Sequence, residues 1–230
     1  MTHTKLFAVV LSLASSQCWA INLISNGSFE SPIVPPSNSF HYQSYTSGAE
    51  FGGWSVTAGS VDLITDYFWS GYTGTQSVDL SGLGSGTIAY PVATTPGMRY
   101  EISFALAGNP ALGSADPTPI KRMRLLWGGT AVADIGFDTT GKTFSDMGWQ
   151  NQTVIVEAVN PFTVLAFESL SSGAYGPVID DVQVKWTAVP EPSTSTVAFG
   201  VGLFCFGLLR GLQRARLEKS VATLGAEYKA

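Results

Sequence analysis

The sequence predicts an all-β fold, a β-sandwich or barrel, from three observations. Short segments rich in β-branched and aromatic residues recur between residues 51 and 186, and glycine, serine, threonine or proline bounds each of them. Two of these segments alternate apolar and polar residues, as a strand with one buried face does. No window of ten or more residues between 21 and 187 has the 3.6-residue period of a helix. About ten or eleven short strands without helices indicate a sandwich or barrel.

The first twenty residues have the parts of a secretory signal peptide. Lys5 supplies a positive charge, residues 6–13 form an apolar core, and Cys18-Trp19-Ala20 is a small-x-small cleavage pattern. We therefore expect residues 1–20 to be removed on export. A lipoprotein signal that uses Cys18 is the alternative, but Gln17 is a poor residue immediately before a lipidated cysteine.

The region from residue 21 to residue 187 has the length of one domain and contains no cysteine. A disulfide framework, a cysteine zinc site and a cysteine nucleophile are therefore excluded from it. Six basic residues against fourteen acids give the region a formal charge of −8. Such an acidic surface argues against nucleic acid and anionic polymers as partners.

The strands are predicted in order along this domain. Residues 21–31 indicate a short strand broken by Asn26-Gly27, and the prolines that follow predict a loop. The clearest alternation lies in 99–107, where Tyr100, Ile102, Phe104 and Leu106 share one face. The other strands are expected at 53–56, 60–64, 76–80, 87–90, 121–127, 132–137, 149–157, 162–168 and 178–186.

The strand pattern stops at Thr187, and a tail of different composition follows. A proline- and serine-rich linker at 188–196 precedes an apolar run at 197–209. Thirteen residues are fewer than the roughly 20 of a membrane span, although the uncharged residues 193–196 extend the run to seventeen. We therefore expect a transmembrane helix in this apolar run. The basic residues after the run place its C-terminal end in the cytoplasm. Residues 210–230 form a basic cluster, with Arg210, Arg214 and Arg216, and a polar tail.

The order of motif, apolar run and arginines in this tail is specific. The motif is Val189-Pro190-Glu191-Pro192-Ser193-Thr194, and with the segments after it the tail resembles the PEP-CTERM sorting signal of Gram-negative bacteria. The resemblance implies cleavage near Pro190, Glu191 and Pro192 by an exosortase-type enzyme. It also implies transient anchoring in the inner membrane and transfer to the cell surface or extracellular matrix. Residues 217–230 depart from the pattern, which normally ends at the arginines.

Several motifs of the domain match one group of secreted proteins. They are residues 22–30, Gly53-Trp54, 59–64, 77–82, Pro96-Gly97 with Tyr100, 104–110 and 176–182. With these motifs the domain resembles the choice-of-anchor C and DUF642 group, whose fold is similar to that of galactose-binding jelly rolls. The resemblance implies a jelly-roll β-sandwich at 21–187 in a carbohydrate-associated setting, and no established enzyme activity.

The same resemblance implies a structural calcium ion. In jelly-roll carbohydrate-binding domains similar to this one, an early acidic residue shares a calcium ion with a late aspartate. Glu30 and Asp181 occupy those places here. Calcium takes six to eight oxygen ligands, so both carboxylates with backbone carbonyls would staple the two ends of the domain together. The alternative is that both are ordinary surface carboxylates.

An aromatic block between residues 66 and 72 is the candidate ligand platform. Sugar C–H faces stack on aromatic rings, and a solvent-facing loop with Tyr67, Trp69 and Tyr72 beside the hydrogen-bonding Asp66 would present such rings. The alternative is that these rings belong to the β-core, as we expect for Trp54.

These observations favour an exported, non-catalytic protein that binds a polysaccharide or a cell-wall or matrix glycan. The alternatives are a structural or adhesive matrix protein that binds other proteins, and a glycan-active enzyme. The enzyme is disfavoured because no pair of acids has a recognisable spacing. A serine triad is also disfavoured, since the domain has the single histidine His41 and no Gly-x-Ser-x-Gly motif.

Overall fold

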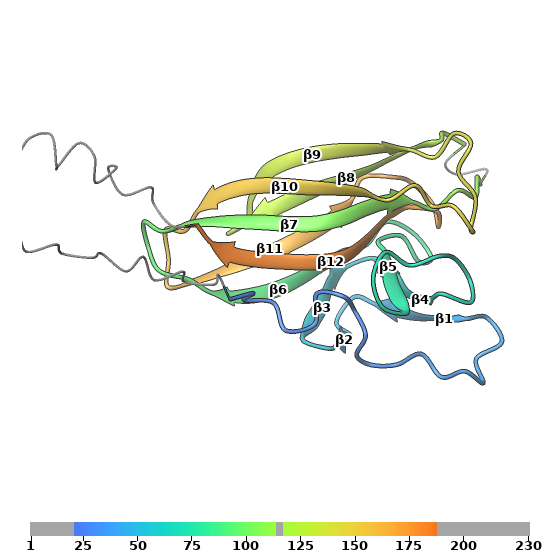
Figure 1. The fold of residues 1–230 in the computed structure, drawn as a ribbon, viewed down its shortest axis with the longest axis horizontal. Helices are drawn as coiled ribbons and strands as arrows, with labels where there is room; N and C mark the ends of the chain where they lie inside the picture. The colour runs from blue at the N-terminus through green and yellow to red at the C-terminus, as the bar shows by residue number, and fades with distance from the viewer. Residues whose placement is uncertain (1–20, 114–116, 188–230) are drawn as a thin grey trace, which may run out of the picture. The chain divides into compact units, whose positions relative to one another are not determined.

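The computed structural model describes residues 21–113 and 117–187, which fold into two six-stranded antiparallel sheets (Figure 1). These ranges contain twelve strands and no helix. The predicted all-β jelly-roll sandwich is thus confirmed. Four predicted segments lie outside the described residues: the signal peptide (1–20), the linker with Pro190-Glu191-Pro192, the apolar segment 197–209 and the tail 210–230. Within the two described ranges, no helix is long and apolar enough to cross a membrane.

The first sheet, sheet A, has the strand order β1-β4-β5-β12-β7-β10. Its strands are β1 (Tyr42–Thr46), β4 (Ser60–Thr65), β5 (Gln76–Asp79), β12 (Pro177–Trp186), β7 (Arg99–Gly108) and β10 (Gln150–Glu157). The second sheet, sheet B, has the order β2-β3-β6-β11-β8-β9. Its strands are β2 (Glu50–Phe51), β3 (Trp54–Ala58), β6 (Thr87–Ala93), β11 (Phe162–Ser169), β8 (Ile120–Trp127) and β9 (Thr130–Asp138).

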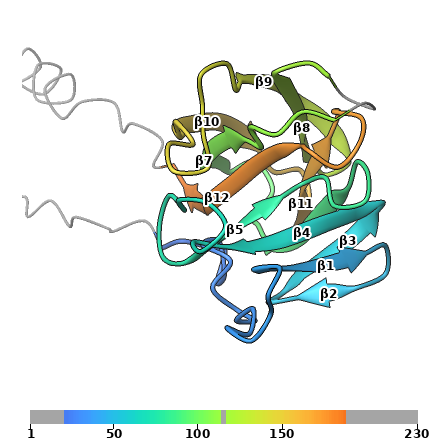
Figure 2. The same cartoon turned by 90° about the vertical axis from the view of Figure 1, so that its right-hand side faces the viewer.

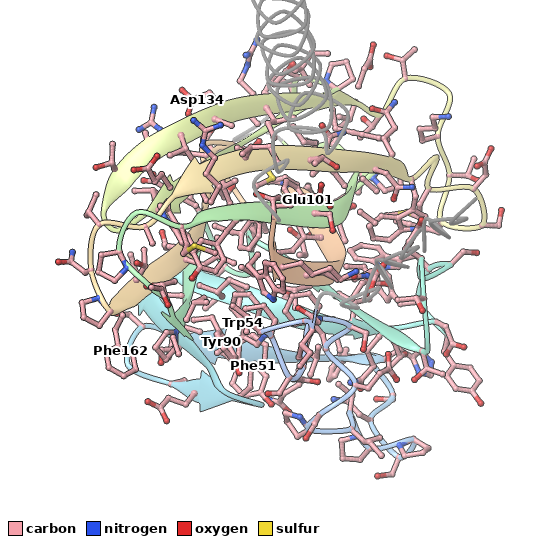
Figure 3. All side chains as sticks on the ribbon, turned by 60° about the vertical axis from the view of Figure 1, so that its left-hand side comes forward. Phe51, Trp54, Tyr90, Glu101, Asp134 and Phe162 are labelled. Carbon is pink, nitrogen blue, oxygen red and sulfur yellow. The ribbon has the colours of Figure 1, made fainter. Side chains whose placement is uncertain are left out.

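The long strands β7 and β12 form the middle of sheet A and follow the predicted alternation. Tyr100, Ile102, Phe104 and Leu106 are all buried in the core between the sheets. Polar residues of the same strands face outward, as Figure 3 shows for Glu101. The pairing of β12 with β7 shifts register between Asp180 and Gln183. At this irregularity Asp181 has a φ of 47°, which turns the strand locally.

Aromatic rings fill the core on the side of sheet B. Trp54 is fully buried, as predicted, and its indole N–H donates to the carbonyl of Asn26 at 3.0 Å. Its ring lies 5.3 Å from that of Phe29 and 5.1 Å from that of Tyr90. Figure 3 shows Trp54 beside Tyr90. Because an indole buries a large apolar area while keeping one hydrogen bond, these contacts fix the N-terminal segment on the sandwich.

That N-terminal segment corrects one prediction. Residues 21–31 do not form a regular strand; they make turns, although the Leu23 N–H still donates to the Val184 carbonyl at 2.8 Å. Gly27 lies so close to β12 that a Cβ atom there would overlap the carbonyl of Val182. The close approach of the two backbones takes the place of the predicted strand. The short strands β1 and β2 were not predicted.

A buried carboxylate joins three segments of the sandwich. Asp79, at the end of β5, accepts hydrogen bonds from the backbone N–H groups of Ser81 (2.9 Å) and Gly176 (3.1 Å). It also accepts one from the Asn109 side chain at 2.9 Å. Burial raises the pKa of Asp79 to about 8, although these three hydrogen bonds act in the opposite direction.

Candidate functional site

The connection between β4 and β5, residues 66–75, contains the predicted ligand platform, and we call it the aromatic loop. Its ends are closed by a hydrogen bond from the Asp66 N–H to the Thr75 carbonyl at 2.8 Å. Figure 2 shows it beside the connection between β9 and β10. The Ser70 N–H donates to the Phe144 carbonyl at 2.8 Å, and the Trp149 indole donates to the Ser70 carbonyl at 3.0 Å. Two connections therefore support each other at this end of the sandwich.

Two acids from opposite ends of the domain hold the second half of the aromatic loop. Glu30 accepts hydrogen bonds from the backbone N–H groups of Thr75 and Gln76, both at 2.9 Å. Asp180 accepts from the backbone N–H groups of Tyr72 (3.1 Å) and Thr73 (2.9 Å). Gly74, which has a φ of 64°, lies against the Glu30 carboxylate. A side chain there would displace this acid, so the loop depends on glycine at that place.

The Asp180 carboxyl has no solvent exposure. Burial raises its pKa to about 7, while hydrogen bonds from Thr73, Asp181 and Tyr72 lower it and the negative charge of Asp181 raises it further. Both oxygens are used, since Oδ1 accepts from the Asp181 N–H and Oδ2 from the loop. Asp180 therefore positions Tyr72 and contacts nothing outside the protein.

The structure separates the four residues that the sequence grouped as one platform. Trp69 is only 2% exposed, its ring packs on Phe68 and Phe144, and its indole donates to the Ser77 hydroxyl at 2.9 Å. The expectation that Trp69 faces solvent is therefore wrong, because the loop folds this ring into the core. Asp66, Tyr67 and Tyr72 are exposed, but they line two different depressions of the surface.

The first depression, which we call the Tyr72 groove, has a volume of about 260 Å³. Its lining consists of Tyr72, Ser103, Phe104, Asn151, Gln152, Thr153 and Asp181. The Tyr72 side chain is 41% exposed, and its ring lies 6.0 Å from that of Trp149 at an angle of 59°. The groove thus combines an exposed aromatic ring with hydroxyl, amide and carboxylate groups from β7, β10 and β12.

The Asp181 carboxylate is the charged group of this lining. Both of its oxygens accept from the Gln183 side-chain amide at 2.9 Å, which fixes the carboxylate. A carboxylate has about four acceptor positions, so the remaining ones can accept hydrogen bonds from a ligand. The groove is therefore suited to a ligand that has hydroxyl donors and an apolar face.

The second depression, which we call the Tyr67 hollow, has a volume of about 230 Å³ and shares no lining residue with the Tyr72 groove. It is lined by Ile33, Val34, Pro35, Pro36, His41, Thr65, Asp66, Tyr67, Thr75 and Gln76. Tyr67 is 78% exposed, and its ring stacks on that of His41 at 5.7 Å. Asp66 and Tyr67 thus belong to this hollow, on the first half of the aromatic loop.

The residues predicted to bind calcium do not contact the same partners. Glu30 binds the start of β5, whereas Asp181 binds Gln183 and lines the groove. Asp180, which was not predicted as a site residue, is the acid that binds the same aromatic loop as Glu30. In residues 21–113 and 117–187, no group of three or more histidine, cysteine, aspartate or glutamate side chains could hold a metal ion. Calcium binding by Glu30 and Asp181 stays a prediction.

Several residues of the Tyr72 groove were missed by sequence reasoning. Ser103 and Thr153 lie opposite each other in the pairing of β7 with β10. Asn151 and Gln152 belong to β10, like Thr153. Contacts that span more than 75 residues of sequence bring them to Tyr72. The only local signal was a polar run at the start of a strand, which does not distinguish a binding surface from an ordinary solvated sheet face.

The fold and this site define an all-β domain with a polar, aromatic-flanked groove. Residues 22–185 match the family described as "Protein of unknown function (DUF642)", and the chain belongs to this family. Residues 188–211 match the PEP-CTERM protein-sorting motif. The resemblances to DUF642 and to the PEP-CTERM sorting signal are confirmed.

Known proteins with similar sequences or folds were also found. Halomucin from Haloquadratum walsbyi is 29% identical over 222 residues, which cover 88% of this chain and 2% of halomucin. The chain thus spans about 2% of the length of this relative. A family 35 carbohydrate-binding module from Clostridium thermocellum has 19% identity and a TM-score of 0.42, and the match covers 62% of this chain and 90% of the module. TmCBM61, solved with β-1,4-galactotriose, has 14% identity and a TM-score of 0.42, over 73% of this chain and all of that one.

Proposed function

We propose that this chain is an exported, non-catalytic carbohydrate-binding protein of the cell surface or extracellular matrix. The observation that carries the proposal is the Tyr72 groove. Its exposed ring offers a stacking surface for the C–H face of a sugar, and Asn151, Gln152 and Asp181 offer hydrogen-bonding groups for hydroxyls. Specific orientation by a few polar groups beside an aromatic wall is typical of small-ligand sites.

The number of acids in the groove favours a binding role over a hydrolytic one. Glycoside hydrolysis uses two carboxyl groups roughly 5–10 Å apart across the scissile bond. The groove lining has one, Asp181, because the neighbouring Asp180 is fully buried and occupied by backbone donors. The acidic balance of the domain and the absence of lysine and arginine from this lining favour a neutral glycan over an anionic one.

The tail gives the proposed route. The sorting motif at 188–211 supports recognition by an exosortase-type enzyme at Pro190, Glu191 and Pro192, with residues 197–209 as a transient inner-membrane anchor. The domain would then be released to the surface or matrix, where its partner is a polysaccharide. Loss of the mature form in cells that lack the processing enzyme would test this route; normal processing in such cells would contradict it.

Replacing Tyr72 with alanine is expected to weaken glycan binding by about tenfold or more, because the ring is the main apolar contact of the groove. Binding to soluble neutral polysaccharides is measured by affinity electrophoresis with the mature chain. Phe162→Ala is the control, since Phe162 is 73% exposed on β11 of sheet B (Figure 3), whereas the groove is lined by the aromatic loop and by strands of sheet A. Equal binding by wild type and Tyr72→Ala would contradict this site.

We also propose a structural calcium ion held by Glu30 and Asp181. Carboxylate and carbonyl oxygens fit calcium. Asp180, the neighbour of Asp181 on β12, binds the same aromatic loop as Glu30, which supports a shared ion near this loop. Chelation is expected to lower the melting temperature of the mature chain, since an ion bound only by the folded state stabilises it. Asp181→Ala is expected to abolish this dependence, whereas Asp134→Ala, an exposed acid on β9, is not. An identical melting curve with and without chelator would remove the calcium proposal.

A further inference from the structure

The Tyr67 hollow has a preformed wall. Gln76 is only 2% exposed, and its side-chain oxygen accepts from the Val34 N–H at 2.7 Å. Its amide nitrogen donates to the carbonyls of Phe29 (2.6 Å) and Pro32 (3.0 Å). One buried side chain thus holds the proline-rich segment 32–36 beside the aromatic loop. A ligand entering the hollow would meet a wall whose position is already fixed, which lowers the entropic cost of binding.

The exposed groups of the hollow resemble those of a sugar site more than those of a solvated loop. Tyr67 and Ile33 are 78% and 75% exposed, and they face the hollow together with Pro35 and Pro36. The stacking of Tyr67 on His41, with 26° between the ring planes, orients the tyrosine ring. Asp66 adds a carboxylate at the edge. Aliphatic and aromatic walls with one hydrogen-bonding acid match a neutral sugar that has an apolar face or a methyl group, such as a 6-deoxyhexose.

We propose that the Tyr67 hollow is a second carbohydrate site and that the domain is therefore bivalent. The hollow and the Tyr72 groove share no lining residue, and they use different residues of one aromatic loop held by Glu30 and Asp180. Two chains of polysaccharide can then be held by one molecule, and simultaneous binding raises the avidity for a polymer. This inference rests on the proposed carbohydrate binding and deepens it, because a bivalent binder cross-links a matrix.

The test counts the sites by calorimetric titration of the mature chain. The probes are rhamnose- and fucose-containing oligosaccharides and the corresponding hexose oligosaccharides. Wild type is expected to bind two oligosaccharides per chain, and Tyr67→Ala and Tyr72→Ala are each expected to bind one. Tyr67→Ala is expected to lose the 6-deoxyhexose preference. Phe40→Ala is the matched control, because Phe40 is 67% exposed near the hollow but does not line it.

A second readout reports cross-linking. Wild type is expected to produce turbidity with a soluble deoxyhexose-containing polysaccharide, and each single variant is expected to lose the turbidity while still binding. One site per wild-type chain, removed by Tyr72→Ala and unaffected by Tyr67→Ala, would overturn the second site and leave the proposed function intact. No binding of any probe by wild type would overturn both.

Discussion

Replacing Trp69 with alanine is expected to lower the free energy of unfolding by about 3–5 kcal/mol, because a large buried ring leaves a cavity. Trp69 is 2% exposed and packs against Phe68 and Phe144. The substitution also removes the indole N–H that donates a hydrogen bond to the Ser77 hydroxyl. Urea unfolding followed by circular dichroism measures the change.

The matched control for this prediction is Tyr67→Ala, in the same loop. Tyr67 is 78% exposed, so its replacement is expected to change the unfolding free energy by about 0.5 kcal/mol or less. A Trp69→Ala variant that kept wild-type stability and lost glycan binding would show that this ring contacts the ligand, against the structure.

Asp79 is expected to make the domain less stable as the pH rises from about 4 to about 8. The reference pKa of this carboxyl, taken for the unfolded chain, is 3.8. In the folded domain its pKa is raised to about 8, mainly because the carboxyl is buried. Between these values the folded state binds the extra proton, so stability is greatest at the acidic end and falls as pH rises through the folded pKa. Each pKa unit corresponds to roughly 1.4 kcal/mol, which makes several kcal/mol an upper bound for this residue.

The measurement compares the pH dependence of unfolding in wild type and Asp79→Asn. The asparagine carbonyl can still accept from Ser81 and Gly176, but it cannot ionise, so we expect a flatter profile between pH 5 and pH 8. Asp138→Asn is the control: Asp138 is exposed, and hydrogen bonds from Thr140 lower its pKa. Its replacement is expected to leave the slope in that range unchanged. Identical profiles for wild type and Asp79→Asn would show that Asp79 does not ionise in this way.

Short β-branched and aromatic segments bounded by turn residues were sufficient to predict most strands, and two of these segments also show the period of two that a half-buried strand must have. Strand β7 illustrates this, since Tyr100, Ile102, Phe104 and Leu106 are all buried. The failures have local physical reasons. Strand β1 was missed because Tyr42–Thr46 is only partly buried and has no clear alternation. A strand was predicted within residues 21–31 because Ile21, Leu23 and Ile24 are apolar, but Gly27 instead brings the backbone against Val182.

The candidate site was predicted only in part. An aromatic-rich loop is visible in the sequence, and Tyr67 and Tyr72 are exposed as predicted. The inward direction of Trp69 depends on Ser77 and Phe144, which no local pattern identifies. The polar half of the Tyr72 groove comes from β10, and it meets the loop only through the pairing of distant strands. Long-range register is the information that composition and periodicity lack.

Site-resolved NMR of the isotopically labelled mature chain, titrated with neutral oligosaccharides, tests the central claim most directly. We expect the amide signals of Asn151, Gln152, Thr153 and Asp181 to shift in a saturable manner, together with that of Tyr72. Signals from the outer side of sheet B, such as that of Asp134, are expected to stay unchanged (Figure 3). Unchanged groove signals at saturating oligosaccharide, or shifts confined to sheet B, would contradict carbohydrate binding at the Tyr72 groove.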